Sequence, residues 1–261
     1  MSKFCPLFSS SSGNCIYIGD SDRGILIDAG VSFKSICEAL SKNDIDIATI
    51  KAVAVTHEHI DHKRGLRPLI KKLGIPVIAS AETLTSLKSE GIIPEGHPVI
   101  EIETTACVDG ICITRIPTCH DCKGSSAYVI AMPDERRYAV CTDLGCTSDD
   151  IVNGISGCDL VMLESNHDIN MLKNGSYPPA TKLRILSDHG HLSNGACACL
   201  LPQLVKSGTT RLVLGHLSQH NNLPTLALSS ARAELLQAGL KDGIDYILYI
   251  APVKDGRMFY L

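Results

Sequence analysis

The run His-Glu-His-Ile-Asp-His, which begins at His57 and directly follows an apolar segment, constrains the fold most. The segment, residues 51–56, has the composition of a buried β-strand. Because alternate residues of an extended chain share a face, we expect His57 and His59 to converge on one ion. Asp61 and His62 lie beyond the bend and can turn towards a second ion. Solvated loop histidines are the alternative, but clustered unpaired imidazoles beside a buried strand are costly.

The run has the form His-x-His-x-Asp-His, the signature of the metallo-β-lactamase superfamily, and this resemblance implies three further ligands, each following a strand. The pairs of strand and ligand are Ile111–Pro117 with His120, Arg137–Thr142 with Asp143, and Arg211–Leu214 with His216. Imidazole and carboxylate ligands together suit zinc, manganese or iron. The resemblance therefore implies a divalent metal site assembled from several strand ends.

This pattern, with the later His, Asp and His in that order, resembles the metallo-β-lactamase superfamily. The resemblance implies an α/β fold of the four-layered αββα sandwich type. It also implies two divalent ions, Zn²⁺ or Mn²⁺, with iron also suitable. The implied ligands are His57, His59 and His120 for the first ion, Asp61, His62 and His216 for the second, and Asp143 as a bridge. Such a pair of ions can activate a shared hydroxide and stabilise charge on the attacking and leaving oxygens.

A further histidine, His191, lies in Gly-His-Leu-Ser-Asn directly before a predicted helix. This element looks like the His-x-(Ser/Thr) element of ribonuclease Z-like phosphodiesterases. The resemblance implies that His191 protonates the leaving oxygen, while Asp61 helps to orient the hydroxide. The alternative is a histidine at a helix N-terminus that pairs with a nearby carboxylate.

Four longer strings resemble the YycJ/WalJ group of that superfamily. They are residues 6–14, 164–168, 187–194 and 215–222. These bacterial single-domain proteins are regarded as exonucleases acting on DNA, so the resemblance implies a DNA exonuclease. The sequence departs from the expected pattern at Cys119, where we expect Ser before the ligand His120.

Four residues are weaker candidates for the substrate or for ligand orientation. Asp28, at the end of a predicted strand, is expected to orient a ligand histidine, although a turn aspartate is the alternative. His167 follows a strand end, where active-site loops lie, and is a candidate for substrate contact. Ser12 and Asn14 belong to a serine-rich loop whose backbone N–H groups could bind phosphate, or which could be a plain tight turn.

A cluster of positive charge follows the histidine run. It consists of Lys63, Arg64, Arg67, Lys71 and Lys72. On a helix beside the site, these side chains would bind the DNA backbone; a solvated helix face is the alternative. The net charge of −4 excludes a general basic coat. Aromatic residues make up only 4% of the chain, with no Trp, so base-stacking platforms are not expected.

Strands mix with helices along the whole chain, which predicts a single domain over residues 1–261. The predicted helices are Phe33–Ser41, Gly65–Leu73, Thr83–Ser89, Asn194–Lys206 and Pro224–Ala238. The interval between Asp143 and His216 leaves no room for an inserted nucleic-acid-clamping domain. The interval between His62 and His120 has no Gly/Pro-rich arm like that of ribonuclease Z.

Twelve cysteines are unusual for this length. The chain has no signal peptide pattern at its start and no membrane-length apolar run, so we expect a cytoplasmic location and reduced thiols. Cys119 and Cys122 bracket His120, but a redox role is disfavoured because that histidine is already a candidate ligand.

Two alternative functions remain open from the sequence. The same pair of metals would serve the hydrolysis of a small carbonyl substrate, such as a thioester, lactone or β-lactam, because fold does not fix substrate. The second alternative is that the chain is a non-catalytic regulator stabilised by its metals. The sequence does not indicate an oligomeric state.

Overall fold

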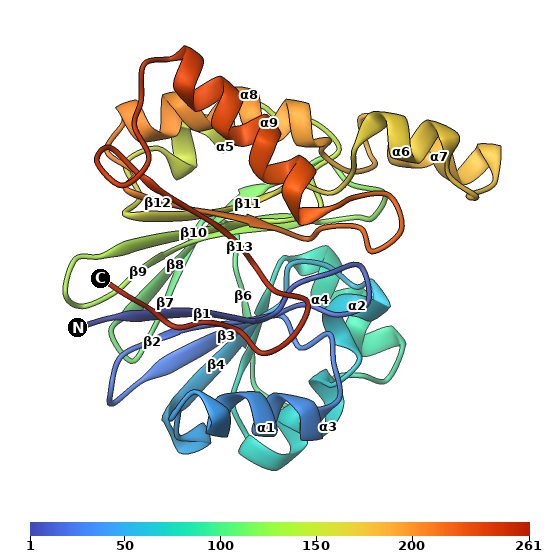
Figure 1. Ribbon diagram of the computed structural model, residues 1–261. Helices are drawn as coiled ribbons and strands as arrows, with labels where there is room; N and C mark the ends of the chain where they lie inside the picture. Colours follow the sequence, from blue (N-terminus) through green and yellow to red (C-terminus); the bar gives the residue numbers. More distant parts are fainter.

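The computed structural model describes residues 1–261 as two seven-stranded mixed sheets that pack face to face, with helices outside both (Figure 1). The first sheet has the order β14-β1-β2-β3-β4-β5-β6 and the second has β13-β12-β11-β10-β9-β8-β7. The strands of the first sheet are β1 (Lys3–Phe8), β2 (Cys15–Gly19), β3 (Gly24–Ile27), β4 (Ile50–Ala54), β5 (Val77–Ala79), β6 (Val99–Glu101) and β14 (Phe259–Tyr260). Those of the second are β7 (Thr105–Val108), β8 (Ile111–Pro117), β9 (Ser126–Ala131), β10 (Arg137–Cys141), β11 (Leu160–Glu164), β12 (Arg211–Gly215) and β13 (Ile247–Ile250).

Alternation along the strands builds three apolar layers. In β11, Leu160 and Met162 face the first sheet, whereas Val161 and Leu163 face the helices of the second. Helices α1, α3 and α4 cover the first sheet and α5, α8 and α9 cover the second (Figure 1). The predicted αββα sandwich is therefore confirmed.

The structure has nine α-helices, and each of the five that were predicted begins and ends within two residues of its predicted bounds. The nine helices are α1 (Phe33–Lys42), α2 (Ile60–Lys63), α3 (Leu66–Leu73), α4 (Ala81–Ser89), α5 (Asp149–Ile155), α6 (Ile169–Asn174), α7 (Pro179–Ile185), α8 (Asn194–Lys206) and α9 (Pro224–Gln237). No helix has both the length and the apolar character that a membrane crossing requires. Helices α2, α5, α6 and α7 were not predicted, and α6 and α7 project from the body of the molecule (Figure 1).

Two antiparallel pairs connect strands that are neighbours in the chain, since β2 pairs with β3 and β9 pairs with β10. Strands β3 and β4 run parallel in one sheet, and β10, β11 and β12 run parallel in the other. Strand β8 shares the direction of β10, because both are antiparallel to β9. The carboxyl ends of these six strands carry the candidate site.

One pair of cysteines corrects the prediction of uniformly reduced thiols. Cys107 on β7 and Cys112 on β8 form a disulfide between neighbouring strands. These residues lie directly opposite each other in the ladder, where side chains are close enough to be bridged. The other ten cysteines are free, as expected.

Candidate metal centre

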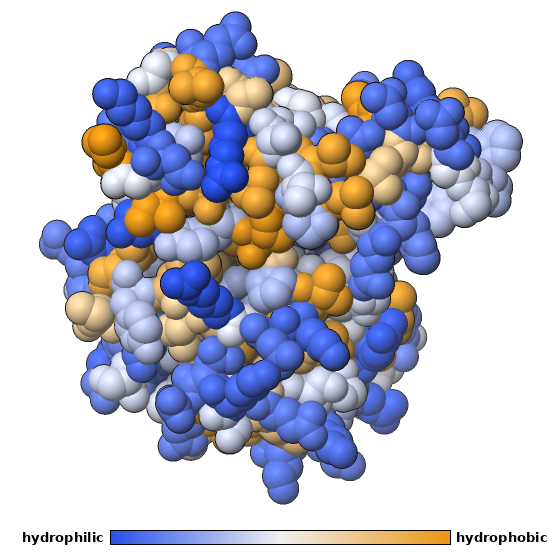
Figure 2. Space-filling view, in the orientation of Figure 1, coloured by the Kyte–Doolittle hydropathy of each residue, from blue (hydrophilic) through white to orange (hydrophobic).

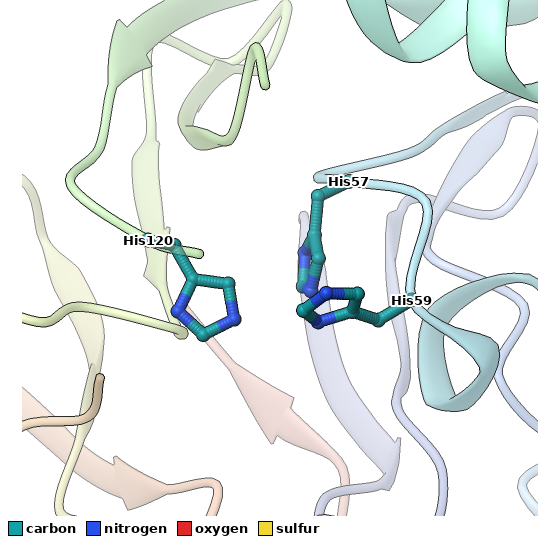
Figure 3. A group of neighbouring side chains, drawn as sticks. All are labelled: His57, His59 and His120. Atoms are coloured by element: carbon teal, nitrogen blue, oxygen red, sulfur yellow. The ribbon is translucent and has the colours of Figure 1, made fainter. Parts of the chain in front are cut away.

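The first group of predicted ligands comes from both sheets. His57 follows β4, His59 lies just before α2, and His120 follows β8. Their ligand atoms lie within 4.8 Å of one another. Figure 3 shows His120 facing His57 and His59 from the opposite side of the site.

A second group lies beside the first. Asp61, His62 and His216 also have ligand atoms within 4.8 Å of one another, as do His57, His62 and Asp143. His62 Nε2 is 3.2 Å from Asp143 Oδ2 and 3.5 Å from Asp61 Oδ2. The structure thus brings all the predicted ligands together, with Asp143 between the two groups.

The donor set fits divalent ions. Four buried ligand atoms have no hydrogen-bond partner, namely His57 Nε2, His120 Nε2, His216 Nε2 and Asp143 Oδ2. Buried polar atoms without partners are rare and costly. Metal coordination would satisfy these atoms, since imidazole and carboxylate are ligands of zinc and manganese.

Backbone conformation at the strand ends aims several of these side chains. Asp28, Asp143 and His216 have positive φ values of 63°, 60° and 54°. This left-handed region is unfavourable for most residues and recurs at functional sites, where the surroundings hold it in place. Each residue lies one or two positions after the end of a strand, where the sharp change in chain direction turns its side chain towards the site.

Hydrogen bonds fix the orientation of two ligand histidines. Asp28 Oδ2 accepts a bond from His62 Nδ1 at 2.7 Å, and Asp28 Oδ1 accepts one from the backbone N–H of Thr56 at 2.8 Å. His120 Nδ1 donates to the carbonyl of Gly190 at 3.0 Å. In both histidines Nε2 is therefore the nitrogen left to bind a metal, with the tautomer set by the partner of Nδ1.

Glu164, at the end of β11, is a functional residue that the sequence analysis missed. Its Oε1 accepts from His216 Nδ1 at 2.8 Å and from His191 Nδ1 at 2.9 Å. Its Oε2 accepts from the backbone N–H groups of Leu144 and Leu192 at 2.7 and 3.0 Å. The only available signal was its position at a strand end within the string 164–168. One buried carboxylate thus orients a candidate ligand and the candidate acid together.

The buried carboxylates of the site create a negative potential that favours a cation or a protonated histidine among them. Burial alone would raise the pKa of the Asp143 carboxyl, but His216 and His62 hold it well below its usual range. Burial also opposes protonation of His216, yet Asp143, Asp61 and Glu164 raise its pKa to about 10. By contrast, burial holds the pKa of His57 well below its usual range, so this imidazole stays neutral.

His191 lies at the rim of the site. Its ring is 5.1 Å from that of His120 and 5.4 Å from that of His216, between centroids. Because Nδ1 is bonded to Glu164, Nε2 is the nitrogen available to a substrate. His167 is buried nearby, both of its ring nitrogens lack partners, and burial lowers its pKa to about 4.

The serine-rich loop lies against the second ligand group. Asn14 Nδ2 is 3.1 Å from His62 Nε2, and the backbone N–H of Asn14 donates to the carbonyl of Asp61 at 2.8 Å. Ser12 is exposed, and its Oγ accepts from Gln219 Nε2 at 3.0 Å. Asn14 therefore touches the site, whereas Ser12 lies at its edge.

The basic cluster is only partly available to a substrate. Arg64, which directly follows α2, and Arg67, Lys71 and Lys72 on α3 are exposed and form no ion pair with an acidic side chain. Lys63 corrects the prediction, because it is buried and its Nζ pairs with Glu90 on the turn after α4. Lys63 was grouped with the other basic residues because it is close to them in the sequence, but its position on α2 directs its side chain towards the interior.

Comparison with known proteins places this geometry in a family. A family model described as a beta-lactamase superfamily domain matches residues 23–217. The chain belongs to the beta-lactamase superfamily. It is a metal-dependent hydrolase, and the predicted resemblance is confirmed.

Two curated relatives narrow the position within the superfamily. The exodeoxyribonuclease WalJ of Streptococcus pneumoniae (serotype 2, strain D39) is 33% identical over 252 residues, which cover 95% of this chain and 93% of WalJ. The exodeoxyribonuclease YycJ of Bacillus anthracis is 33% identical over 245 residues, covering 92% and 91%. This chain is therefore grouped with WalJ and YycJ, as its sequence strings predict.

Solved structures support the fold alone. Yeast PDE1 matches with a TM-score of 0.74 at 14% identity, covering 100% of this chain and 99% of that one. Zn²⁺-bound PqqB from Methylobacterium extorquens matches with a TM-score of 0.71 at 17% identity, covering both chains completely, at 100%.

Proposed function

We propose that this chain is a DNA exonuclease that hydrolyses phosphodiester bonds with two divalent ions. The observation that carries the proposal is the hydrogen-bonded pair of His191 and Glu164 at the rim of the metal centre. A phosphodiester needs a proton donor for its leaving oxygen, whereas many activated carbonyl substrates do not. The names of WalJ and YycJ favour DNA as the polymer.

The ligand assignment in this proposal follows the two groups of side chains. His57, His59 and His120 would hold the first ion, Asp61, His62 and His216 would hold the second, and Asp143, which lies between the two groups, would serve both. Such ions lower the pKa of water to about 7 and neutralise charge on a phosphate. Zn²⁺, Mn²⁺ and iron all suit this donor set.

The protein's own groups complete the chemistry. His191 carries a proton on Nε2 and gives it to the leaving oxygen, while Glu164 holds the opposite nitrogen and stabilises the charged ring. Asp61 accepts a hydrogen bond from the attacking water and so orients it. Arg64 and Arg67 contact phosphates of the DNA backbone, an interaction that requires no particular base sequence.

Chain organisation and location belong to the same proposal. The interval between Asp143 and His216 contains strand β11 and helices α5, α6, α7 and α8, and no separate clamping domain. We therefore take residues 1–261 as one domain. The ten free cysteines are consistent with a cytoplasmic enzyme.

The test is degradation of end-labelled duplex DNA, single-stranded DNA and RNA by the enzyme loaded with Mn²⁺ or Zn²⁺. An exonuclease degrades linear DNA and leaves covalently closed circular DNA intact. Cleavage of a thioester or lactone without degradation of any nucleic acid would instead favour a carbonyl hydrolase. A metal-loaded chain that is inert towards all of them would favour a regulator.

A substitution tests the role of His191. His191→Ala should lower kcat/KM on DNA by about 10²-fold or more. The loss should be much smaller on bis(p-nitrophenyl) phosphate, because nitrophenolate leaves without a proton. His189→Ala, an exposed histidine two residues earlier, is the matched control. Equal losses by His191→Ala on both substrates would contradict the assignment of a general acid.

A further inference from the structure

Helices α6 and α7 form a projection that the proposed chemistry does not use. We call residues Ile169–Ile185 the α6–α7 arm. Figure 1 shows it extending beyond the two sheets on the side where the loops of the metal centre lie. Two apolar side chains, Leu172 and Ile185, are buried and hold the arm to the body. The other residues of the arm are exposed or half-buried, and Figure 2 shows both hydrophilic and apolar side chains on this lobe.

The arm is positively charged although the chain as a whole is acidic. It contains Lys173, Lys182 and Arg184 and no Asp or Glu, whereas the chain carries a net charge of −4. Lys173 and Lys182 form no ion pair, and Lys182 Nζ donates to the carbonyl of Lys173 at 2.8 Å, so the two residues are neighbours. An unneutralised pair of lysines on a projecting element attracts an anionic partner.

Contacts at the base of the arm connect it to the metal centre. Arg184 pairs with Asp121, whose Oδ1 lies 3.1 Å from His120 Nε2 and 3.5 Å from His59 Nε2. On the other side, the ring of Tyr177 packs at 5.9 Å from that of His220, in the loop that follows the ligand His216. The arm therefore has a defined position relative to the site of hydrolysis.

A second basic surface lies on the first sheet's side of the site. It is formed by Arg64, which directly follows α2, and by Arg67, Lys71 and Lys72 on α3, all of which are exposed. The metal centre lies between ligands from the two sheets, and each sheet's side contributes one basic element. A polyanion that enters the site would thus meet positive charge from both.

We infer that the α6–α7 arm binds the sugar–phosphate backbone of the DNA substrate beyond the bond that is cleaved. The inference rests on the proposed nuclease function and identifies a binding surface for it. A second copy of this chain is the competing occupant, because Leu183 and Leu186 are 71% and 40% exposed. A symmetric dimer through the arm would bring two copies of the same positive charge together, whereas DNA neutralises it.

The test measures binding by the metal-loaded enzyme to a fluorescent duplex whose ends carry phosphorothioate linkages that resist hydrolysis. Removing Lys173 and Lys182 together, as Lys173→Ala/Lys182→Ala, should raise Kd at least tenfold near 150 mM salt. The slope of log Kd against log salt should fall by about two, because each lost phosphate contact removes roughly 0.9. The ratio of DNA to small-diester turnover should fall in parallel.

The matched control is Lys206→Ala, an exposed lysine at the far end of α8. It should leave both Kd and the slope unchanged. If the wild type degrades DNA but the double variant binds it with unaltered Kd and slope, the inference is wrong. It is also wrong if Leu183→Asp converts a dimer to a monomer while DNA binding persists. If the wild type does not degrade DNA at all, the proposed function fails first.

Discussion

A single buried carboxylate, that of Glu164, orients both a candidate metal ligand and the candidate general acid. Glu164 uses one oxygen for His191 and His216 and the other for two backbone N–H groups. Neighbouring histidines lower the pKa of Glu164 to about 2 despite its burial, so the group is anionic at neutral pH. The negative charge fixes Nδ1 as the protonated nitrogen of both rings, which directs both Nε2 atoms towards the site.

We predict that Glu164→Gln lowers kcat on DNA by about 10- to 100-fold, the loss typical of a group that orients metal ligands. The amide keeps the size of the side chain but places an NH₂ group opposite an N–H donor. The unfolding free energy should also fall by about 1–3 kcal/mol, because a buried donor is left unsatisfied. Steady-state kinetics and urea unfolding measure the two effects.

Glu38→Gln, an exposed change on α1, is the control for this substitution and should alter neither quantity. The bound metal content of Glu164→Gln separates its two roles. Loss of one ion would report on His216, whereas full metal content with low activity would report on His191. Wild-type kcat with full metal content would contradict the role of Glu164 in orientation.

The ligands could be predicted from the sequence, whereas Glu164 could not, for a physical reason. The run from His57 to His62 contains four candidate ligands within six residues, so their spacing in the sequence is enough to predict them. Glu164 acts on residues 27 and 52 positions away. Only the packing of β11 beside β12 brings those side chains within hydrogen-bond distance, and no local pattern contains that information.

Gly30 is required by a close approach of two backbones. A Cβ atom there would lie 1.6 Å from the carbonyl oxygen of Asp61 and 2.6 Å from the backbone nitrogen of Asn14. We predict that Gly30→Ala lowers the unfolding free energy by about 1–3 kcal/mol and weakens metal binding, because the loops must separate. Denaturant unfolding and metal titration measure these losses.

Gly195 is the matched control, because it lies on the first turn of α8 with nothing within 4 Å of a built Cβ. Gly195→Ala should raise the unfolding free energy by about 0.4–1 kcal/mol, since alanine restricts the unfolded chain and favours the helix. The same chemical change thus has opposite signs at the two positions. A stable, fully metal-loaded Gly30→Ala would contradict the predicted collision.

At the scale of elements, the sequence predicted those with strong periodicity or clear turns and missed the short ones. The strands β8, β10 and β12 and the helices α8 and α9 were predicted within a few residues. Strands β5 and β6 have only three residues each, and the four-residue edge strand β7 has no buried residue, so none of the three shows a readable alternation of apolar and polar residues in the sequence. Helices α6 and α7 bury one residue each, which leaves no apolar stripe to detect.

Helix α8 connects stability to catalysis through its N-cap. Ser193 Oγ accepts from the backbone N–H of Ala196, and this cap lies two residues after His191. We predict that Ser193→Ala lowers the unfolding free energy by about 1 kcal/mol and also lowers kcat on DNA, because the segment that carries His191 loosens. Chemical denaturation and kinetics provide the measurements.

Ser148→Ala provides the comparison, because Ser148 caps α5 in the same way and lies away from His191 in the chain. Both variants should lose similar stability, and only Ser193→Ala should lose activity. Equal activity in the two variants would show that the cap of α8 contributes to stability alone.

On the scale of the whole molecule, the candidate site joins two sheets that also meet through a shared apolar layer and through hydrogen bonds, such as the one that Tyr128 Oη donates to the carbonyl of Val55. The loops after β4 supply His57, His59, Asp61 and His62, whereas the second sheet supplies His120, Asp143 and His216. Each group of three ligands contains residues from both sides. A bound ion therefore links the sheets, and ligand binding to the folded state alone raises its stability.

We predict that Zn²⁺ or Mn²⁺ at about 100 times its Kd raises the unfolding free energy of metal-free protein by roughly 2.7 kcal/mol for each independent site. Calorimetry of the chelated and reloaded protein measures this gain. His59→Ala removes a ligand of the first group only, and His216→Ala removes a ligand of the second group only. Each variant should therefore keep about half of the metal-dependent gain in unfolding free energy. His97→Ala, whose ring bonds only to the carbonyl of Ile75, should keep the whole gain. A melting temperature that does not respond to metal would contradict the linkage, because two ions held between the sheets cannot leave the folded state unstabilised.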